Sequence, residues 1–205
     1  MVFDHLSINL PLTSHTESMT EWTWLGDHPA VDLANTIRIV DGQRVELIGT
    51  VDAFAEWADL EPAALPPARP RTEAELTRVH RLRDSAVRLL DAAVTGRELP
   101  AADVRAVNDA VRASATTRLI GGRVGATETE ARDGTGLDGL LGVLAATVVD
   151  LLGRDHLANL AVCHADGCGQ FFHRARPNQR WCSPGCGNRA RVDRHRHRRR
   201  ATPTP

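Results

Sequence analysis

The chain has 205 residues, of which 42% are hydrophobic and 25% charged, with a formal net charge of −1. This length and composition are typical of a soluble globular protein with one domain of ordinary size and a small appended unit. No stretch approaches the length of a membrane span, and residues 1–21 lack the basic start and apolar run of a secretory signal, so we expect a cytoplasmic protein.

Positive charge is concentrated near the C-terminal end. Residues 163–200 contain ten arginines and two aspartates, a net charge of +8, whereas the remainder of the chain carries −9. This division is typical of a polyanion-binding unit attached to a body that does not bind polyanions. The alternative is that the basic segment folds back onto the acidic body when no partner is bound.

The first part of the chain carries few structural signals. Residues 1–20 mix polar and scattered apolar residues, and we expect a leader with little order there. Residues 26–29 predict a turn that leads into a short helix or strand. The side chains of Asp32, Asn35 and Thr36 form a candidate ligand pocket, although polar residues of this kind more often cap helices and hydrogen-bond loops. Both interpretations stay open at this point.

Local signals then predict a strand, a helix and a connector. Residues 44–48 alternate in polarity like a brief strand. Thr50 is a suitable N-cap for a helix over residues 51–58, whose apolar side chains share one face. Four prolines between residues 61 and 71 indicate an extended connector, because proline disrupts the interior of a helix.

Three further predicted helices account for most of the body. Apolar residues at helical spacing begin after Thr72 and end near Gly96, and a second helix follows Pro100. Residues 137–152 form the most apolar helix, which we expect at the centre of the core. Residues 116–120 and 123–132 are rich in β-branched side chains and are joined around a glycine pair, so they predict a small hairpin.

The four cysteines fall as two close pairs. Cys163 with Cys168 and Cys182 with Cys186 are separated by thirteen residues. This layout indicates a closed four-thiolate Zn²⁺ site, because thiolates are soft ligands that zinc holds in a tetrahedron. Two disulfides would require an oxidising compartment, and a redox pair would have the two-residue gap that is absent here.

The segment around the cysteines predicts a small zinc finger. Residues 170–174 and 179–181 are expected to pair as strands around a turn at 175–178, which would bring the second cysteine pair beside the first. The apolar residues 157–162 are expected to form a strand that leads directly into Cys163. This short link predicts that the finger packs against the body.

A helix is expected to begin inside the second cysteine pair. Ser183 is a good N-cap and Pro184 a good first helical residue, so Cys186 falls in the first turn. Together, the first cysteine pair, the hairpin and this helix predict a treble-clef-like arrangement.

This last predicted helix carries arginines around its circumference without an apolar stripe. Its like charges repel one another, so a polyanion is the natural partner and counterion release supplies affinity. Asn188 and Arg189, near its start, are suited to read bases in the major groove, or equally to hydrogen-bond to the thiolates or the hairpin. The candidate nucleic-acid-binding residues are Asn188, Arg189, Arg191, Arg194, Arg196, Arg198, Arg199 and Arg200.

Two segments resemble known families. Arg-Trp-Cys-Ser at 180–183 and Cys-Gly-Asn-Arg at 186–189 resemble the signature of the CGNR zinc finger family. Gly26 and Asp-Leu-Ala-Asn-Thr at 32–36 resemble the opening of the ABATE domain, which precedes CGNR fingers in a group of bacterial transcription regulators. The resemblance implies DNA binding by the finger and sensing of a ligand or partner by the preceding domain.

We therefore expect an α+β protein: a mainly helical N-terminal domain with a small hairpin, plus a C-terminal treble-clef-like zinc finger. The expected division is a flexible leader at 1–20, an ABATE-like helical domain at 21–160, the finger with its basic helix at 161–200 and a tail at 201–205.

The expected function is that of a zinc-binding and DNA-binding transcription regulator whose partner is double-stranded DNA. A small-molecule effector or a protein partner is expected for the N-terminal domain. The alternatives are an RNA-binding zinc protein and a protein-interaction module with a purely structural zinc site. An enzyme is not expected, because four thiolates close the metal to catalysis and no nucleophile with a base is visible.

Overall fold

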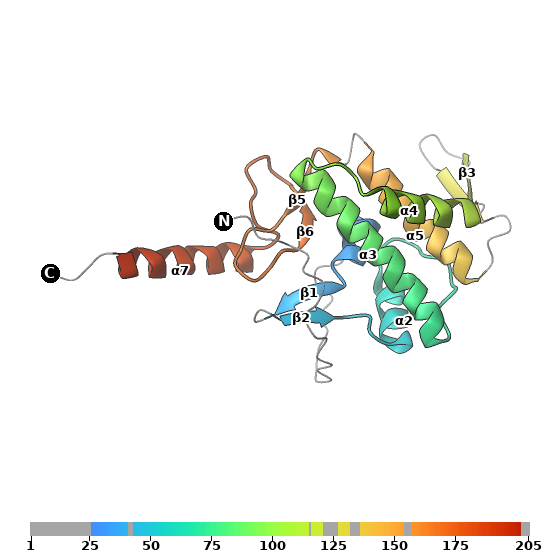
Figure 1. The fold of residues 1–205 in the computed structure, drawn as a ribbon, viewed down its shortest axis with the longest axis horizontal. Coiled ribbons are helices and arrows are strands. Elements are labelled where there is room, and N and C mark those ends of the chain that lie inside the picture. Colours follow the sequence, from blue (N-terminus) through green and yellow to red (C-terminus); the bar gives the residue numbers. More distant parts are fainter. Residues whose placement is uncertain are drawn as a thin grey trace.

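The computed structural model describes residues 26–40, 43–114, 116–120, 127–131, 136–153 and 157–201. The expected leader at 1–20, the glycine pair of the predicted hairpin turn and residues 202–205 of the expected tail lie outside the described residues. Within the described ranges, helices dominate and the strands form two-stranded antiparallel sheets (Figure 1). The expected α+β class is confirmed.

The helical body follows the predicted order. The short helix α1 (Pro29–Ala34) follows the turn, and α2 (Val51–Leu60), α3 (Glu73–Thr95), α4 (Ala101–Ala113) and α5 (Leu137–Leu152) come next. Residues 61–71 between α2 and α3 contain no helix or strand, as the prolines predict.

Side chains and one glycine set the helix ends. The hydroxyl groups of Thr50 and Thr72 accept hydrogen bonds from the backbone N–H groups of Ala53 and Glu75, which caps α2 and α3. Gly96 ends α3 in the left-handed conformation, with φ of 68°, which costs glycine little. Each of these boundaries was predicted from the residue type alone.

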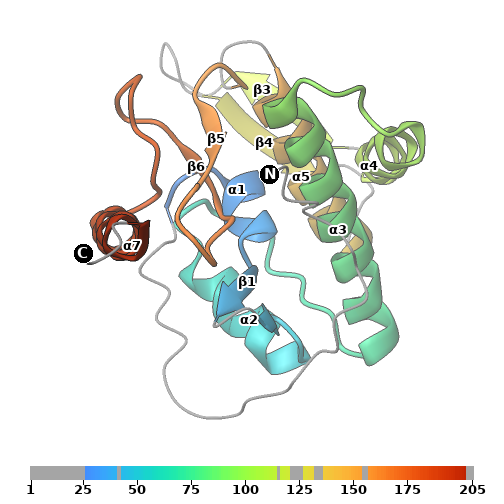
Figure 2. The ribbon, with the colours of Figure 1, turned by 60° about the vertical axis from the view of Figure 1, so that its left-hand side comes forward.

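Helix α5 lies at the centre of the core. Its Leu140, Leu144, Val148 and Leu151 are completely buried. Helices α1, α3 and α4 all pack against it (Figure 2). At roughly 1.5–3 kcal/mol for each fully buried large apolar side chain, this one helix supplies a large part of the hydrophobic stabilisation.

The contact between α4 and α5 requires a glycine. A Cβ atom added at Gly142 would lie 1.7 Å from the Cβ of Ser114, the residue that ends α4. The absence of a side chain at this position therefore lets the two helices approach closely.

Three antiparallel strand pairs accompany the helices. Strand β1 (Ile37–Val40) pairs with β2 (Gln43–Glu46), and β3 (Thr116–Ile120) pairs with β4 (Thr127–Ala131). These last two strands confirm the hairpin expected from residues 116–120 and 123–132, of which residues 123–126 and 132 lie outside the described part of the chain. The strand expected at 44–48 is found as β2, two residues shorter at its end, and its partner β1 was not predicted.

The strand pairing of the finger corrects the prediction. Strand β6 (Phe171–His173) pairs with β5 (Leu160–Val162), with Val162 opposite Phe171, and not with residues 179–181. Strand β5 covers only the last three residues of the strand expected at 157–162. The turn expected at 175–178 is present, since Gln179 N–H donates to the Arg176 carbonyl over 3.0 Å, but it leads towards α7 (Pro184–Ala201) rather than into a paired strand.

The finger and the body share one hydrophobic core. Leu160, Val162 and Phe171 belong to the same buried cluster as the side chains of α3 and α5. A second, smaller cluster surrounds the cysteines and includes Phe172 and Ala161. The expected packing of finger against body is confirmed, and alternate residues of β5 and β6 face the two clusters. Within the described residues, no helix is both long and apolar enough to cross a lipid bilayer.

Candidate metal centre and nucleic-acid interface

The four cysteine side chains converge on one point. Cys163 follows β5, Cys168 lies in the loop before β6, Cys182 precedes α7 and Cys186 lies in its first turn. All four Sγ atoms lie within 4.8 Å of one another. The Sγ atoms of Cys168, Cys182 and Cys186 are 3.6–3.7 Å apart. A tetrahedron with Zn–S bonds of about 2.3 Å has S–S edges of about 3.8 Å, so the cluster has the size of a zinc site.

Local backbone structure forms both halves of this cluster. Gly167 and Gly169 have φ of 67° and 68°, and the Cys168 N–H donates to the Ala165 carbonyl over 3.1 Å. These left-handed glycines fold the first cysteine pair into a tight loop. At the second pair, the Ser183 hydroxyl accepts from the Cys186 N–H over 3.2 Å, which confirms the predicted N-cap.

The pKa values of the cysteine thiols indicate why a cation is needed to hold four thiolates together. Hydrogen bonds from Cys168 and Cys182 lower the pKa of Cys163, and those same contacts to Cys163 raise the pKa values of Cys168 and Cys182. Without a metal, several sulfurs this close cannot all ionise, because the first thiolate opposes the next. A bound Zn²⁺ supplies the charge that stabilises four thiolates together.

Two contacts join the start of α7 to the metal centre. Arg189 Nη2 donates to Cys186 Sγ over 3.3 Å, which places a guanidinium directly on a metal ligand. The Trp181 ring packs over Gly187, where an added Cβ would lie 3.5 Å from the ring, and Arg194 lies 5.8 Å from its centroid. These contacts support the structural role that the sequence left open for Arg189, although its side chain is also exposed.

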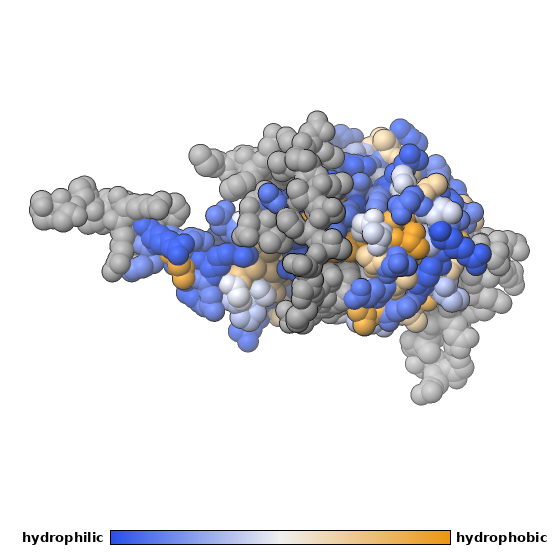
Figure 3. Space-filling model, turned by 90° about the horizontal axis from the view of Figure 1, so that it is seen from below, coloured by the Kyte–Doolittle hydropathy of each residue, from blue (hydrophilic) through white to orange (hydrophobic). Residues whose placement is uncertain are grey.

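Helix α7 extends away from the body, and its C-terminal end is the most distant described part of the chain (Figure 1). Its surface is almost entirely hydrophilic (Figure 3), with half-exposed Val192 as an isolated apolar side chain. Arg191 donates to Asn188 Oδ1, and Arg196 lies 3.9 Å from Asp193. Arg198, Arg199 and Arg200 lie on the same helix, but their side chains are outside the described part of the structure.

The three polar residues of the N-terminal motif are all buried. Asp32 accepts a hydrogen bond from the Gly26 N–H over 2.8 Å, and Thr36 donates to the Leu33 carbonyl over 2.7 Å. Burial, opposed by the hydrogen bond from Gly26 and assisted by nearby acidic groups such as Glu61, raises the pKa of Asp32 to about 7. Asp32 and Thr36 therefore tie together the backbone around α1.

Asn35, the third residue, reaches the finger. Its Nδ2 donates to the Phe171 carbonyl over 2.9 Å, and the Phe171 N–H donates to its Oδ1 over 3.0 Å. It is also the one residue of the three that lines an open cavity between body and finger.

Two functional contacts were not predicted from the sequence. Asp27 accepts hydrogen bonds from the backbone N–H and ring Nδ1 of His173, which links the turn before α1 to β6. Arg83, with only 1% of its surface exposed, pairs with Glu46 and Asp84 and donates to Thr36 Oγ1. Apart from Asp84, which is adjacent to Arg83, the partners are far apart in the chain, so no short-range signal marks these contacts.

Two protein-family models match separate parts of the chain. The family model ABATE, described as "Putative stress-induced transcription regulator", matches residues 27–155, which is more than half of the chain. The model described as "CGNR zinc finger" matches residues 159–199 and thus includes all four cysteines. Among curated proteins, none matches the chain. With the sulfur geometry, the finger match confirms the predicted zinc cofactor. The chain therefore belongs to the ABATE family and carries a C-terminal CGNR zinc finger.

Proposed function

We propose that this protein is a transcription regulator that binds double-stranded DNA through the zinc finger and the arginines of α7. The observation that carries this proposal is that a helix rich in arginine holds zinc ligand Cys186 in its first turn and extends clear of an otherwise acidic protein (Figure 1). The metal centre holds the first turn of α7 in place. The direction of the helix relative to the body is therefore set before any partner binds.

The dimensions and charge of α7 suit a DNA groove. Its eighteen residues correspond to a length of about 27 Å. The major groove of B-DNA is about 12 Å wide and admits one helix. Seven arginines against Asp193 on this helix favour phosphate contacts, and release of counterions would supply the affinity.

Arginines at different positions along α7 would have different roles. Arg189 is engaged with Cys186 Sγ, so we assign it to the support of the metal centre. Arg191, Arg194 and Arg196 are exposed and would contact phosphates, together with Arg198, Arg199 and Arg200 further along. Asn188 would read a base only after releasing Arg191, to which it is hydrogen-bonded.

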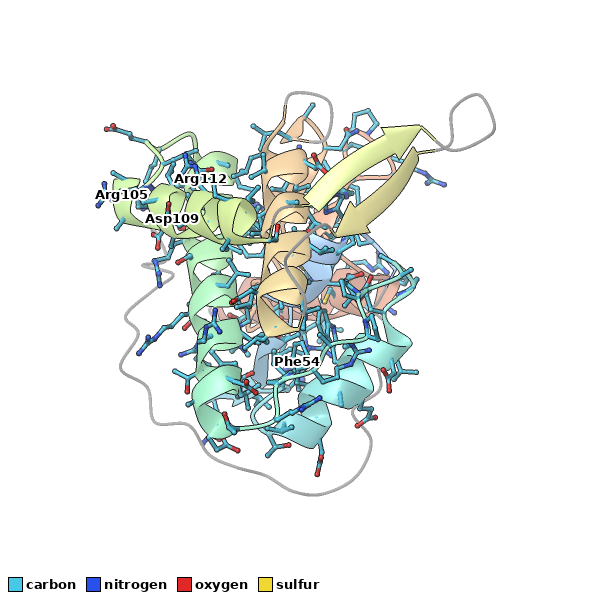
Figure 4. The ribbon with its side chains drawn as sticks, turned by 90° about the vertical axis from the view of Figure 1, so that its right-hand side faces the viewer. Phe54, Arg105, Asp109 and Arg112 are labelled. Carbon is cyan, nitrogen blue, oxygen red and sulfur yellow. The ribbon has the colours of Figure 1, made fainter. Side chains whose placement is uncertain are left out.

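A salt titration with matched variants tests this assignment. We would compare the wild type with the triple variant Arg191→Gln, Arg194→Gln and Arg196→Gln. The control carries Arg105→Gln and Arg112→Gln, whose side chains point outward from α4 on the body (Figure 4). The slope of log K against log salt for duplex DNA should fall by about 0.9 for each arginine that no longer neutralises a phosphate, and only in the α7 variant. Equal slopes in all three proteins would remove α7 from the interface.

A selection experiment tests the class of nucleic acid. The zinc-loaded protein would be incubated with sheared genomic DNA and total RNA at near-physiological salt, and the retained molecules sequenced. Enrichment of a short DNA motif is the expected result. Enrichment of RNA, or of no nucleic acid, would contradict the proposal and favour RNA recognition or a protein-docking role for the finger.

A further inference from the structure

An open cavity of about 780 Å³ is lined by residues of both the body and the finger. Asn35 and Arg38 line it from the body, Gln170 and Phe172 from β6 and the residue before it, and Arg189 and Arg196 from α7. The metal ligands Cys168, Cys182 and Cys186 also line it, so the cavity adjoins the metal centre. Pockets for small ligands commonly have volumes of about 300–1,000 Å³, and they occur preferentially between domains. The size and position are therefore those of a ligand site.

Guanidinium groups from both sides face this space. Arg38 belongs to β1 of the body, whereas Arg189 and Arg196 belong to α7. Three carboxylates also line the cavity, but Asp27 is hydrogen-bonded to His173 through both oxygens, and Asp193 lies near Arg196 at 3.9 Å. The third, Asp166, lies in the exposed loop of the first cysteine pair. Paired arginine forks match the geometry of carboxylate and phosphoryl oxygens.

The side chain of Gln170 independently indicates a ligand site, because its buried amide group lacks a hydrogen-bond acceptor. Only 6% of its surface is exposed, and its Oε1 accepts a long 3.5 Å hydrogen bond from Arg38. Its Nε2 is buried and has no hydrogen-bond partner in the described structure. A buried amide N–H without an acceptor is costly, so an oxygen atom brought to this wall of the cavity would be favoured.

We infer that this cavity binds a small oxyanion, carried on a carboxylate or phosphoryl group, between Arg38 of the body and Arg189 and Arg196 of α7, with Gln170 donating a further hydrogen bond. Such a ligand would touch both family domains at once. It would also neutralise Arg196, one of the arginines assigned to DNA phosphates, so it would compete with nucleic acid; this consequence, unlike the binding itself, rests on the proposed function.

The test uses the zinc-loaded full chain without nucleic acid. Sodium phosphate and sodium succinate would be titrated separately at constant ionic strength, while NMR follows the side-chain amide signals of Gln170 and Asn35. We expect a saturable shift of the Gln170 signal with at least one of the two anions. Saturation by phosphate alone would identify a phosphoryl ligand, and saturation by succinate alone a carboxylate ligand.

Two variants separate this site from general attraction to arginine. Arg38→Gln removes the body's guanidinium, and Arg196→Gln changes an exposed side chain whose loss leaves the core intact. Each should weaken anion binding by roughly tenfold or more, whereas the control Arg105→Gln on α4 should leave it unchanged. Absence of saturable binding by both anions, or equal binding in all variants, would overturn the inference.

A second measurement relates the cavity to the proposed function. In the presence of a saturating anion, duplex DNA should bind the wild type more weakly, at constant ionic strength. Anion binding without any DNA binding would contradict the proposed function and leave the cavity site standing. DNA binding by a protein that binds neither anion would support the proposed function and contradict the cavity site.

Discussion

Asn35 and Phe171 exchange two hydrogen bonds across 136 positions of the chain, at 2.9 and 3.0 Å. The side-chain amide of Asn35, which ends α1, thereby satisfies both backbone groups of a residue in β6. Both residues are buried, with 5% and 7% of their surfaces exposed. An asparagine can do this because its amide presents a donor and an acceptor side by side, as a peptide group does.

Asn35→Ala should weaken the joint between the ABATE domain and the finger. The variant leaves the N–H and C=O groups of Phe171 buried without partners, and each costs about 1–3 kcal/mol. We expect a loss of about 2–5 kcal/mol in the free energy of unfolding, together with faster amide hydrogen exchange at Phe171. Asn178→Ala, in the exposed turn of the finger, is the control. A variant as stable as the control would show that the pair contributes nothing to the joint.

Zinc removal should destabilise the body as well as the finger. Leu160, Val162 and Phe171 belong to the main core, while their chain neighbours Ala161 and Phe172 pack around the cysteines. Loss of the cysteine cluster would therefore loosen side chains of the main core. We expect chelation to lower the thermal midpoint of the whole protein, measured by helical circular dichroism.

Cys182→Ser provides the matched comparison for chelation. The variant removes one of four ligands, and apparent zinc-binding energies in small fingers are about 10–16 kcal/mol, so it should resemble the chelated wild type. Added zinc should restore the wild type and not the variant. If chelation left the melting of the body unchanged, the two units would be independent.

Arg189→Gln distinguishes support of the metal centre from contact with nucleic acid. Because Arg189 donates to Cys186 Sγ, its loss should weaken zinc binding by about 10–100-fold, the usual effect of removing a partner of a metal ligand. Competition with a chromogenic chelator measures this affinity. Arg191→Gln is the control, since Arg191 bonds to Asn188 and not to a cysteine. Unchanged zinc affinity with weaker DNA binding would place Arg189 at the DNA instead.

Asp32 should make stability depend on pH. Burial raises its pKa from 3.8 to about 7, so the folded protein holds this proton more tightly than the unfolded chain. The resulting stabilisation is complete below about pH 4 and is lost as the pH rises through about 7. Asp32→Asn can still accept from Gly26 and cannot ionise.

Urea unfolding across this pH range would test the effect. Relative to the wild type, Asp32→Asn should gain up to about 4 kcal/mol between pH 4 and pH 8, at about 1.4 kcal/mol for each unit of pKa shift. Asp109→Asn, an exposed residue on α4 (Figure 4), is the control and should show no such gain. Parallel pH profiles for the wild type and Asp32→Asn would show that Asp32 is ionised in the folded protein.

Local signals predicted the helices well. The bounds of α5 at residues 137–152, the caps Thr50 and Thr72, and the stop at Gly96 all follow from residue types within one or two turns. The N-cap Ser183 and the cysteine spacing likewise indicated the finger. Such features depend on interactions between residues a few positions apart, so they can be read directly from the order of the residues.

Strand partners were predicted less well. The sequence indicated pairing of residues 170–174 with 179–181, because these are the nearest extended segments, whereas β6 pairs with β5 on its other side. The choice is made by the core: Leu160, Val162 and Phe171 gain burial against the body in this pairing. Strand β1 was missed for a different reason. It pairs with the adjacent strand β2, with Val40 opposite Gln43, and the Asp-Gly sequence at 41–42 between them is a local hairpin signal that the prediction did not use.

The sequence by itself therefore determined the zinc ligands, the basic character of α7 and the order of the helices, all of which depend on residue type and short spacing. Only the tertiary structure decided that Asn35 hydrogen-bonds to Phe171 and that Arg189 donates to Cys186 Sγ. It also decided that Arg38 and Arg196 line one cavity. These relationships join elements whose separation in space is set by core packing, because burying apolar surface selects one arrangement of the helices and the polar contacts form where that arrangement brings them together.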